Sequence, residues 1–173
     1  MDASAKIVLS GEIGSGKSTV VRAAMRRLGW AQPGGFFTHW DGAEPGAQQL
    51  YFETWAGERH LMARRKPAPP DAVPYELDGA NFVRLAVASL AETAAGRPVV
   101  IDELGPIELA AAGFPEAVGR LFRGGAPVLA VIQRRALDRW LEVIGRERVT
   151  RRLDATPANR DALPAQIAAE FGA

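Results

Sequence analysis

The stretch "GEIGSGKST", Gly11 to Thr19, concentrates three glycines and a lysine in nine residues. The residues just before it, "KIVLS" from Lys6 to Ser10, form an apolar run that predicts a short buried strand. After Lys17 the apolar residues recur at helical spacing, and the helix should end near Gly29. The stretch therefore predicts a glycine-rich turn that joins a strand to a helix.

This turn matches the pattern G-x-x-x-x-G-K-[ST] of phosphate-binding loops. Glycines let backbone N–H groups turn inward around phosphate oxygens, and the helix N-terminus adds partial positive charge. In this pattern Lys17 reaches the β- and γ-phosphates, and the Ser18 hydroxyl ligates Mg²⁺. The alternative, a glycine-rich turn with an incidental lysine, fits the flanking strand and helix less well. The predicted nucleotide-binding residues of this loop are Gly11, Glu12, Ile13, Gly14, Ser15, Gly16, Lys17, Ser18 and Thr19.

A second apolar run, "PVVIDELGPIEL" from Pro98 to Leu109, contains two adjacent acids. Proteins with a phosphate-binding loop need an acid at the end of a neighbouring strand to hold Mg²⁺, and Asp102 supplies it. Glu103 can polarise a water aimed at the γ-phosphate, as a general base. The alternative is a strand end with two solvated acids. For Glu108, a role in the site and a role as a helix-start or surface acid are equally good interpretations.

The rest of the chain predicts an α/β fold, because continuous apolar strands alternate with amphipathic helices. Such a pattern favours a mainly parallel sheet with helices on both faces. "GGFFTHW" and "QLYFETW" predict strands joined by the loop "DGAEPG". Residues 63–79, with four prolines and a basic triplet, predict a surface loop. Further helices are expected over residues 81–95, 114–122, 137–144 and 163–171, and "PVLAVI" should form another buried strand.

The composition of the chain excludes several classes of site and partner. The chain has 173 residues, 47% of them hydrophobic and 24% charged, which suits a single globular domain over residues 1–173. Its net charge of +1 points to neither a nucleic-acid nor a membrane partner. The absence of cysteine excludes disulfides, thiolate zinc sites and cysteine nucleophiles. No apolar run approaches a membrane span, so a soluble cytoplasmic protein is expected.

Other side chains carry weaker signals. Core or edge packing is the better interpretation of the four tryptophans, although Trp40 is the best candidate among them for stacking on a base. His39 and His60 are expected on strands or the surface. The triplet Arg64, Arg65 and Lys66 could form a lid over transferring phosphate, but a solvated basic turn fits it better.

At four places the chain resembles the small P-loop nucleoside-triphosphatases first described from thermophiles, a family that includes the cancer-related nucleoside-triphosphatase. The first is the loop at residues 11–19, and the second is "GGFFT" at 34–38, similar to a Gly-Phe-x-Thr element. The third, "VVIDELGPIEL" at 99–109, resembles the family's Asp-Glu-Ile-Gly-Lys-Met-Glu-Leu signature. The fourth, "ATPANRDALPAQI" at 155–167, resembles a late Thr-x-x-Asn-Arg-x-x-Leu segment. In this order the matches span nearly the whole chain.

The resemblance implies a P-loop NTPase with a RecA-like sheet. It implies slow, Mg²⁺-dependent hydrolysis of nucleoside triphosphates (ATP, GTP, CTP, UTP) to diphosphate and phosphate, with little base preference. Lys17, Glu103 and Glu108 would then be catalytic, Ser18 and Asp102 metal-associated, and Asn159 and Arg160 near the nucleotide base. Pro106 stands where the family has a lysine, and "HWDG" at 39–42 replaces an acidic-Val-Arg run. Turnover or substrate could differ accordingly.

Two other functions fit the same residues. A nucleotide or metabolite kinase also needs the loop, the Mg²⁺ acid and lid arginines, and it would release phosphate only when an acceptor is present. A non-catalytic switch would bind nucleotide tightly and present its state to a protein partner, which the sequence does not identify. Whether an arginine is supplied by the chain itself or by a partner is also open.

Overall fold

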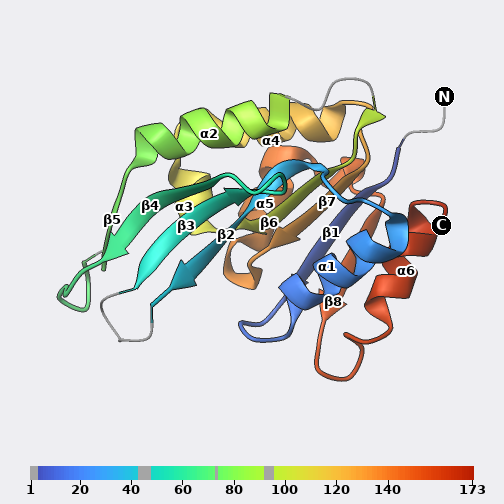
Figure 1. The fold of residues 1–173 in the computed structure, drawn as a ribbon, viewed down its shortest axis with the longest axis horizontal. Coiled ribbons are helices and arrows are strands. Elements are labelled where there is room, and N and C mark those ends of the chain that lie inside the picture. The colour runs from blue at the N-terminus through green and yellow to red at the C-terminus, as the bar shows by residue number, and fades with distance from the viewer. Residues whose placement is uncertain (1–3, 43–47, 73, 92–95) are drawn as a thin grey trace.

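The computed structural model describes residues 4–42, 48–72, 74–91 and 96–173. In these ranges eight strands form one sheet in the order β5-β4-β3-β2-β6-β7-β1-β8 (Figure 1). The strands are β1 (Lys6–Gly11), β2 (Gly34–Asp41), β3 (Gln49–Thr54), β4 (Arg59–Arg65), β5 (Tyr75–Leu77), β6 (Val99–Leu104), β7 (Val128–Ile132) and β8 (Arg151–Ala155). The helices are α1 (Lys17–Leu28), α2 (Gly79–Ala91), α3 (Pro106–Ala110), α4 (Phe114–Arg123), α5 (Leu137–Ile144) and α6 (Leu163–Glu170), with short 3₁₀ turns η2 (Arg134–Ala136) and η3 (Arg146–Arg148).

The sheet has a parallel part and an antiparallel extension. Strands β2, β6, β7, β1 and β8 pair in parallel. Strands β3, β4 and β5 continue the sheet beyond β2 as an antiparallel meander. The carboxyl ends of parallel strands meet at one edge, where ligands bind in open α/β sheets. The predicted α/β fold with a mainly parallel sheet is confirmed.

Helices cover both faces, as the apolar pattern predicted. On one face α2, α4 and α5 pack around a core that includes Phe36, Phe114 and Trp140. On the other, α1 and α6 pack on the parallel strands around Val21 and Ile167, and in Figure 1 this pair stands apart from α2, α4 and α5. The parallel strands are therefore buried on both sides, which explains their continuous apolar sequences.

The surface loop predicted for residues 63–79 is wrong at both ends. Residues 63–65 belong to β4, and residues 75–77 form β5, which pairs with them. Arg65 does not lie in a solvated turn: its guanidinium carbon stands 4.7 Å from the centre of the Trp40 ring. Residues 43–46 of the predicted "DGAEPG" loop and residues 92–95 of the predicted helix lie outside the described residues.

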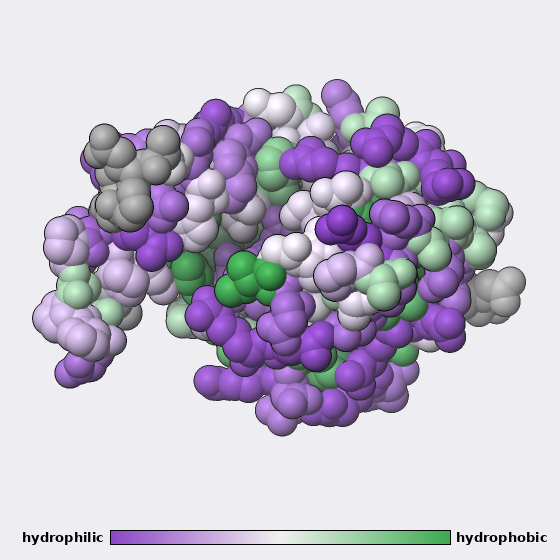
Figure 2. Space-filling model, turned by 90° about the horizontal axis from the view of Figure 1, so that it is seen from below, coloured by the Kyte–Doolittle hydropathy of each residue, from purple (hydrophilic) through white to green (hydrophobic). Residues whose placement is uncertain are grey.

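No helix built by the described residues has the length and apolar character that crossing a bilayer requires. The lower edge of the molecule in Figure 1, seen face-on in Figure 2, is mainly hydrophilic, with scattered apolar residues. The loop between β1 and α1 lies at this edge.

Candidate active site

The loop from Gly11 to Gly16 connects β1 to α1, as the sequence predicted. At Gly11 the backbone has φ of +153°, and a Cβ there would lie 2.6 Å from the Ala155 carbonyl oxygen of β8. A side chain at this position would force the loop or β8 to shift. The loop is therefore pressed against the end of β8, which fixes where its N–H groups lie relative to the sheet.

Lys17, the first residue of α1, holds its ammonium group over the loop. Its Nζ donates to the carbonyl oxygens of Gly11 at 3.1 Å and Glu12 at 2.8 Å, and the residue is only 8% exposed. Backbone acceptors thus position the charge at the mouth of the loop without neutralising it. An anion there would meet a lysine that is already oriented.

Asp102 lies near the end of β6 and is 4% exposed. Burial raises the pKa of its carboxyl to about 6, and the neighbouring charge of Glu103 adds to this. A hydrogen bond with the Ser18 side chain acts in the opposite direction and lowers the pKa, as do the charges of Arg22 and Lys17. The sequence-predicted metal residues, Ser18 and Asp102, are therefore brought into direct contact.

Glu103 reaches the same cavity because the β6–β7 ladder is irregular at this point. Asp102 pairs with Val131 and Leu104 with Ile132, which leaves Glu103 as an extra residue. Such a bulge changes the direction of one side chain. Glu103 is partly exposed, and its Oε1 accepts a hydrogen bond from Nε2 of Gln133.

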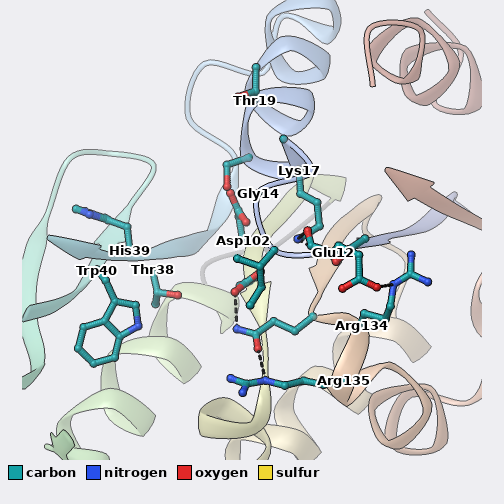
Figure 3. Close-up of a pocket in the computed structure, with 16 residues that line it drawn as sticks. Glu12, Gly14, Lys17, Thr19, Thr38, His39, Trp40, Asp102, Arg134 and Arg135 are labelled. Carbon is teal, nitrogen blue, oxygen red and sulfur yellow. Dashed lines mark hydrogen bonds and ion pairs between the residues drawn. The ribbon is translucent and has the colours of Figure 1, made fainter. Parts of the chain in front are cut away.

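These groups surround one cavity of about 480 Å³ (Figure 3). The phosphate-binding loop forms one wall, and the end of β2 forms the opposite one through Thr38, His39 and Trp40. The floor carries Asp102 and Glu103. Gln133, Arg134 and Arg135, which follow β7, complete the lining. Lysine, arginine and paired carboxylates in one hollow suit a polyphosphate and its cation.

Six of the lining residues were not among the predicted site residues. Gln133, Arg134 and Arg135 follow directly after the apolar strand "PVLAVI", at the edge where the parallel strands end. That position was a usable signal, because polar residues after buried parallel strands gather at the ligand-binding edge. The other three are Thr38, His39 and Trp40, of which only Trp40 has a predicted role, as a candidate for stacking on a base.

Arg134 links the phosphate-binding loop to β8 through two ion pairs. Its Nε lies 2.9 Å from Glu12 Oε1, and its Nη2 lies 2.6 Å from Asp154 Oδ1 in β8. The guanidinium therefore bridges the loop and the neighbouring strand. Figure 3 shows it on the side of the cavity where Glu12 lies.

Glu108 lies outside the cavity lining. It is 4% exposed in α3, and its Oε2 accepts a 2.8 Å hydrogen bond from the Gly105 N–H at the start of that helix. Burial raises the pKa of its carboxyl to about 7, although the hydrogen bonds from the backbone of Glu108 and Gly105 oppose the shift. The helix-start interpretation matches this contact, but the residue is buried rather than on the surface.

Asn159 and Arg160 also lie outside this cavity, on the far side of the loop. The Asn159 side chain accepts a 2.8 Å hydrogen bond from the Thr156 N–H and donates a 2.8 Å bond to the Asp154 carbonyl, so it shapes the turn after β8. Arg160 runs beside the loop: a Cβ on Gly16 would lie 3.2 Å from its Cδ. It lines a second hollow of about 460 Å³ with Thr19 and Arg27.

The donor set around Ser18 and Asp102 suits a magnesium ion. Both offer oxygen, the ligand atom that Mg²⁺ takes, and a buried carboxylate gains most from an adjacent cation. Among the described residues, no group of three or more histidine, cysteine or acidic side chains is placed to hold a metal. The residues present therefore fit an ion that takes its remaining ligands from phosphate and water, as Mg²⁺ does in phosphoryl-transfer sites.

Comparisons with known proteins agree with this geometry. The model of the NTPase family matches residues 6–168. The nucleoside-triphosphatase THEP1 of Thermotoga maritima is 28% identical over 166 residues, covering 94% of this chain and 92% of the relative. That of Methanosarcina barkeri is 29% identical over 173 residues, covering 96% and 97%.

Two solved structures have the same fold. The crystal structure of THEP1 from the hyperthermophile Aquifex aeolicus superimposes with a TM-score of 0.77 at 25% identity, covering 97% of this chain and 99% of the other. The solution structure of a human cancer-related nucleoside triphosphatase gives a TM-score of 0.76 at 26% identity, covering 96% of each chain.

Proposed function

This chain belongs to the NTPase family and is a nucleoside-triphosphatase, and we propose that it hydrolyses ATP, GTP, CTP and UTP, with little base selectivity, to diphosphate and phosphate in the presence of Mg²⁺. One observation carries the proposal. Lys17, the Ser18–Asp102 pair and the partly exposed Glu103 face a single cavity from two elements, the start of α1 and the end of β6. This arrangement supplies a phosphate-binding group, a cation site and a general base.

The loop and Lys17 bind the β- and γ-phosphates, because N–H groups and an ammonium group are the donors that phosphate oxygens accept. Ser18 and Asp102 would hold Mg²⁺, which neutralises phosphate charge when bound. Glu103 accepts the proton of the attacking water. We leave Glu108 out of the chemical step, because its carboxylate is buried against Gly105 and does not line the cavity.

The nucleoside should lie on the other side of the loop from Glu103. Arg160 passes beside Gly16 there and lines a hollow with Thr19 and Arg27. We infer that Arg160 contacts the nucleoside and that Asn159 holds the turn from which Arg160 extends. A flexible arginine can stack on any base, which is compatible with low base selectivity.

We also infer that residues 1–173 act as one unit, since the NTPase model spans residues 6–168. The expected location is the cytoplasm, with nucleoside triphosphates as the ligands and neither a membrane nor a specific nucleic acid as a partner. The net charge of +1 supports the last part.

The test is phosphate release by the purified chain from each triphosphate, with Mg²⁺ and no added acceptor. We expect turnover for all four and a loss of about 100-fold or more in kcat for Glu103→Gln, with nucleotide affinity retained. Release only after an acceptor is supplied would identify a kinase instead. Tight binding without release, with a conformational difference between di- and triphosphate forms, would identify a switch. Equal turnover by Glu103→Gln and the parent would exclude Glu103 as the base.

A further inference from the structure

Hydrolysis of a triphosphate is accelerated by a positively charged group beside the γ-phosphoryl oxygens while the bond to the leaving diphosphate breaks. In P-loop enzymes an arginine supplies part of that charge, either from the same chain or from a partner. The described residues that line the cavity include three lysine and arginine side chains, namely Lys17, Arg134 and Arg135. Lys17 already belongs to the phosphate-binding loop, so the choice lies between the two arginines.

Arg134 already forms two ion pairs within the chain. Two of its nitrogens pair with Glu12 and Asp154, at 2.9 and 2.6 Å. To reach a phosphate, Arg134 would have to break both ion pairs, and the loop would lose its link to β8. Its charge is also shared with two carboxylates, which weakens its attraction for a third anion.

Arg135 forms no such ion pair among the described residues, although its charge acts on the nearby Glu108 carboxyl and lowers the pKa of that group. Its Nε donates to Gln133 Oε1 at 3.0 Å, and within the described part of the chain no hydrogen bond or ion pair joins either terminal nitrogen to another residue. Figure 3 shows its side chain below Asp102, away from the place where Arg134 meets Glu12. Two pairs of N–H donors are thus left over on the Glu103 side.

The position of Arg135 relative to Glu103 is set by a single residue. The Gln133 carboxamide donates to Glu103 and accepts from Arg135, so both of its ends are used. Its backbone N–H donates to the Leu104 carbonyl at 2.9 Å. Its side chain also packs against Gly105 so closely that a Cβ on that glycine would lie 2.8 Å from the carboxamide carbon. Gln133 therefore has little freedom, and the arginine and the acid are held as a pair.

We propose that Arg135 is the arginine that this chain itself supplies to the γ-phosphoryl group, and that Gln133 is a positioning residue that couples it to Glu103. The inference rests on the proposed function. A water oxygen bonds to the γ-phosphorus while the bond from that phosphorus to the β,γ-bridging oxygen breaks. The water proton goes to Glu103, and the bridging oxygen leaves with the diphosphate and keeps the bonding electron pair. The terminal N–H groups of Arg135 donate to the non-bridging γ-oxygens, where negative charge is held during transfer.

Gln133 contributes in two ways. Its N–H donation engages one oxygen of Glu103 and leaves the other to take the proton. Its carbonyl orients the guanidinium plane, which must be aligned to donate two parallel hydrogen bonds. Loss of Gln133 should therefore disturb both the base and the arginine.

The test compares Arg135→Ala with Arg139→Ala, which removes the same charge from an exposed position on α5. We expect kcat for Arg135→Ala to fall about 100- to 1000-fold, and kcat for Arg139→Ala to stay within threefold of the parent. The affinity for ADP should stay within about threefold, because a diphosphate lacks the group that Arg135 contacts. Affinity for ADP with aluminium fluoride, which imitates the transferring group, should fall in parallel with kcat.

Rescue separates a direct contact from a structural role. Added guanidinium ion should restore part of the activity of Arg135→Ala and none of that of Glu103→Gln. Gln133→Met, which keeps the side-chain volume, should lower kcat and reduce the affinity for the aluminium fluoride complex but not for ADP. Arg135→Ala with kcat within threefold of the parent would overturn the proposal, as would equal loss of affinity for ADP and for the aluminium fluoride complex. A parent that releases no phosphate would instead refute the proposed function.

Discussion

The indole N–H of Trp140 donates a 3.1 Å hydrogen bond to the backbone carbonyl of Gly105. Trp140 is fully buried in α5, and Gly105 begins the turn that follows Asp102 and Glu103. The bond thus joins the hydrophobic core directly to the segment that carries the acids. The position of these acids depends on core packing as much as on the strand that ends there.

Replacing Trp140 by Phe should therefore destabilise the fold. The change removes the indole N–H that donates to the buried Gly105 carbonyl, and it leaves a void beside the Phe114 ring, 6.2 Å away between centroids. We expect a loss of about 2–3 kcal/mol in the free energy of unfolding, measured by urea denaturation. Trp30→Phe is the matched control, because Trp30 is only partly buried against Phe171. An equal loss in both variants would show that the bond to Gly105 contributes nothing.

A side chain at Gly11 should disrupt the loop more than one at Gly14. Both glycines have positive φ, but a Cβ at Gly11 meets the Ala155 carbonyl at 2.6 Å, whereas one at Gly14 meets nothing within 4 Å. Gly14→Ala should cost about 1–2 kcal/mol from backbone strain, and Gly11→Ala about 1–3 kcal/mol more from the contact with β8. Thermal unfolding of both variants measures the difference. Similar melting temperatures would mean that the loop does not press on β8.

Asp102→Asn should remove the effect of Mg²⁺ on nucleotide binding. Asparagine keeps the shape and the hydrogen bond to Ser18, but it lacks the charge that attracts a cation. Calorimetry with ADP should show that Mg²⁺ tightens binding to the parent, with affinity for the ion about 10- to 100-fold weaker in the variant. Asp138→Asn, in which the acid is paired with Arg146 on the surface, is the control. Retention of the full Mg²⁺ effect in Asp102→Asn would contradict the assigned cation site.

Glu108 should make stability depend on pH. Burial raises the pKa of this carboxyl from its ordinary value of 4.5 to about 7 in the folded chain. Below pH 4.5 the group is protonated in both states. As the pH rises from about 4.5 to 7, the unfolded chain releases the proton before the folded one does, so stability falls by roughly 3 kcal/mol and stays lower above pH 7.

Glu108→Gln cannot titrate and should abolish that fall, so the variant gains stability over the parent at pH 8 and little at pH 4.5. Its amide oxygen can still accept the hydrogen bond from Gly105, which keeps the start of α3 intact. Urea denaturation at several pH values checks this, with the exposed Glu116→Gln as control. A variant that shows the same decline with pH as the parent would assign the pH dependence to another group.

The two edge strands carry the weakest signal in the sequence. Strand β8, "RRLDA", has exposed arginines and lies at one margin of the sheet, and β5 is a three-residue strand at the other margin. Such strands are polar and short because an open edge must not pair with other chains, and they therefore lack the apolar alternation that identifies a strand. The prolines between β4 and β5 strengthened the loop interpretation of residues 63–79.

The site shows a similar division. That Lys17, Ser18, Asp102 and Glu103 line one cavity could be predicted, because each stands in a short segment whose spacing already fixes its geometry. The place of Gln133 and Arg135 after an apolar strand signalled that they lie at this edge, but the link from Arg135 through Gln133 to Glu103 could not be predicted. It depends on the pairing of β6 with β7, which brings together residues 30 positions apart in the chain. Glu108 was placed in the active site by resemblance, yet its carboxylate turns back to its own helix.

The sequence by itself determined the phosphate-binding turn, the buried strands, the helices with a clear apolar stripe and the family resemblance. These depend on interactions between residues close in the chain, or on an apolar pattern that can be read in one segment. Only the tertiary structure decided which charged side chains are free to act. Arg134 and Arg135 are adjacent and identical in type, but acids from two other segments hold Arg134, whereas the terminal donors of Arg135 have no partner within the part of the chain that the structure describes. Long-range strand pairing makes that difference, and no local pattern encodes it.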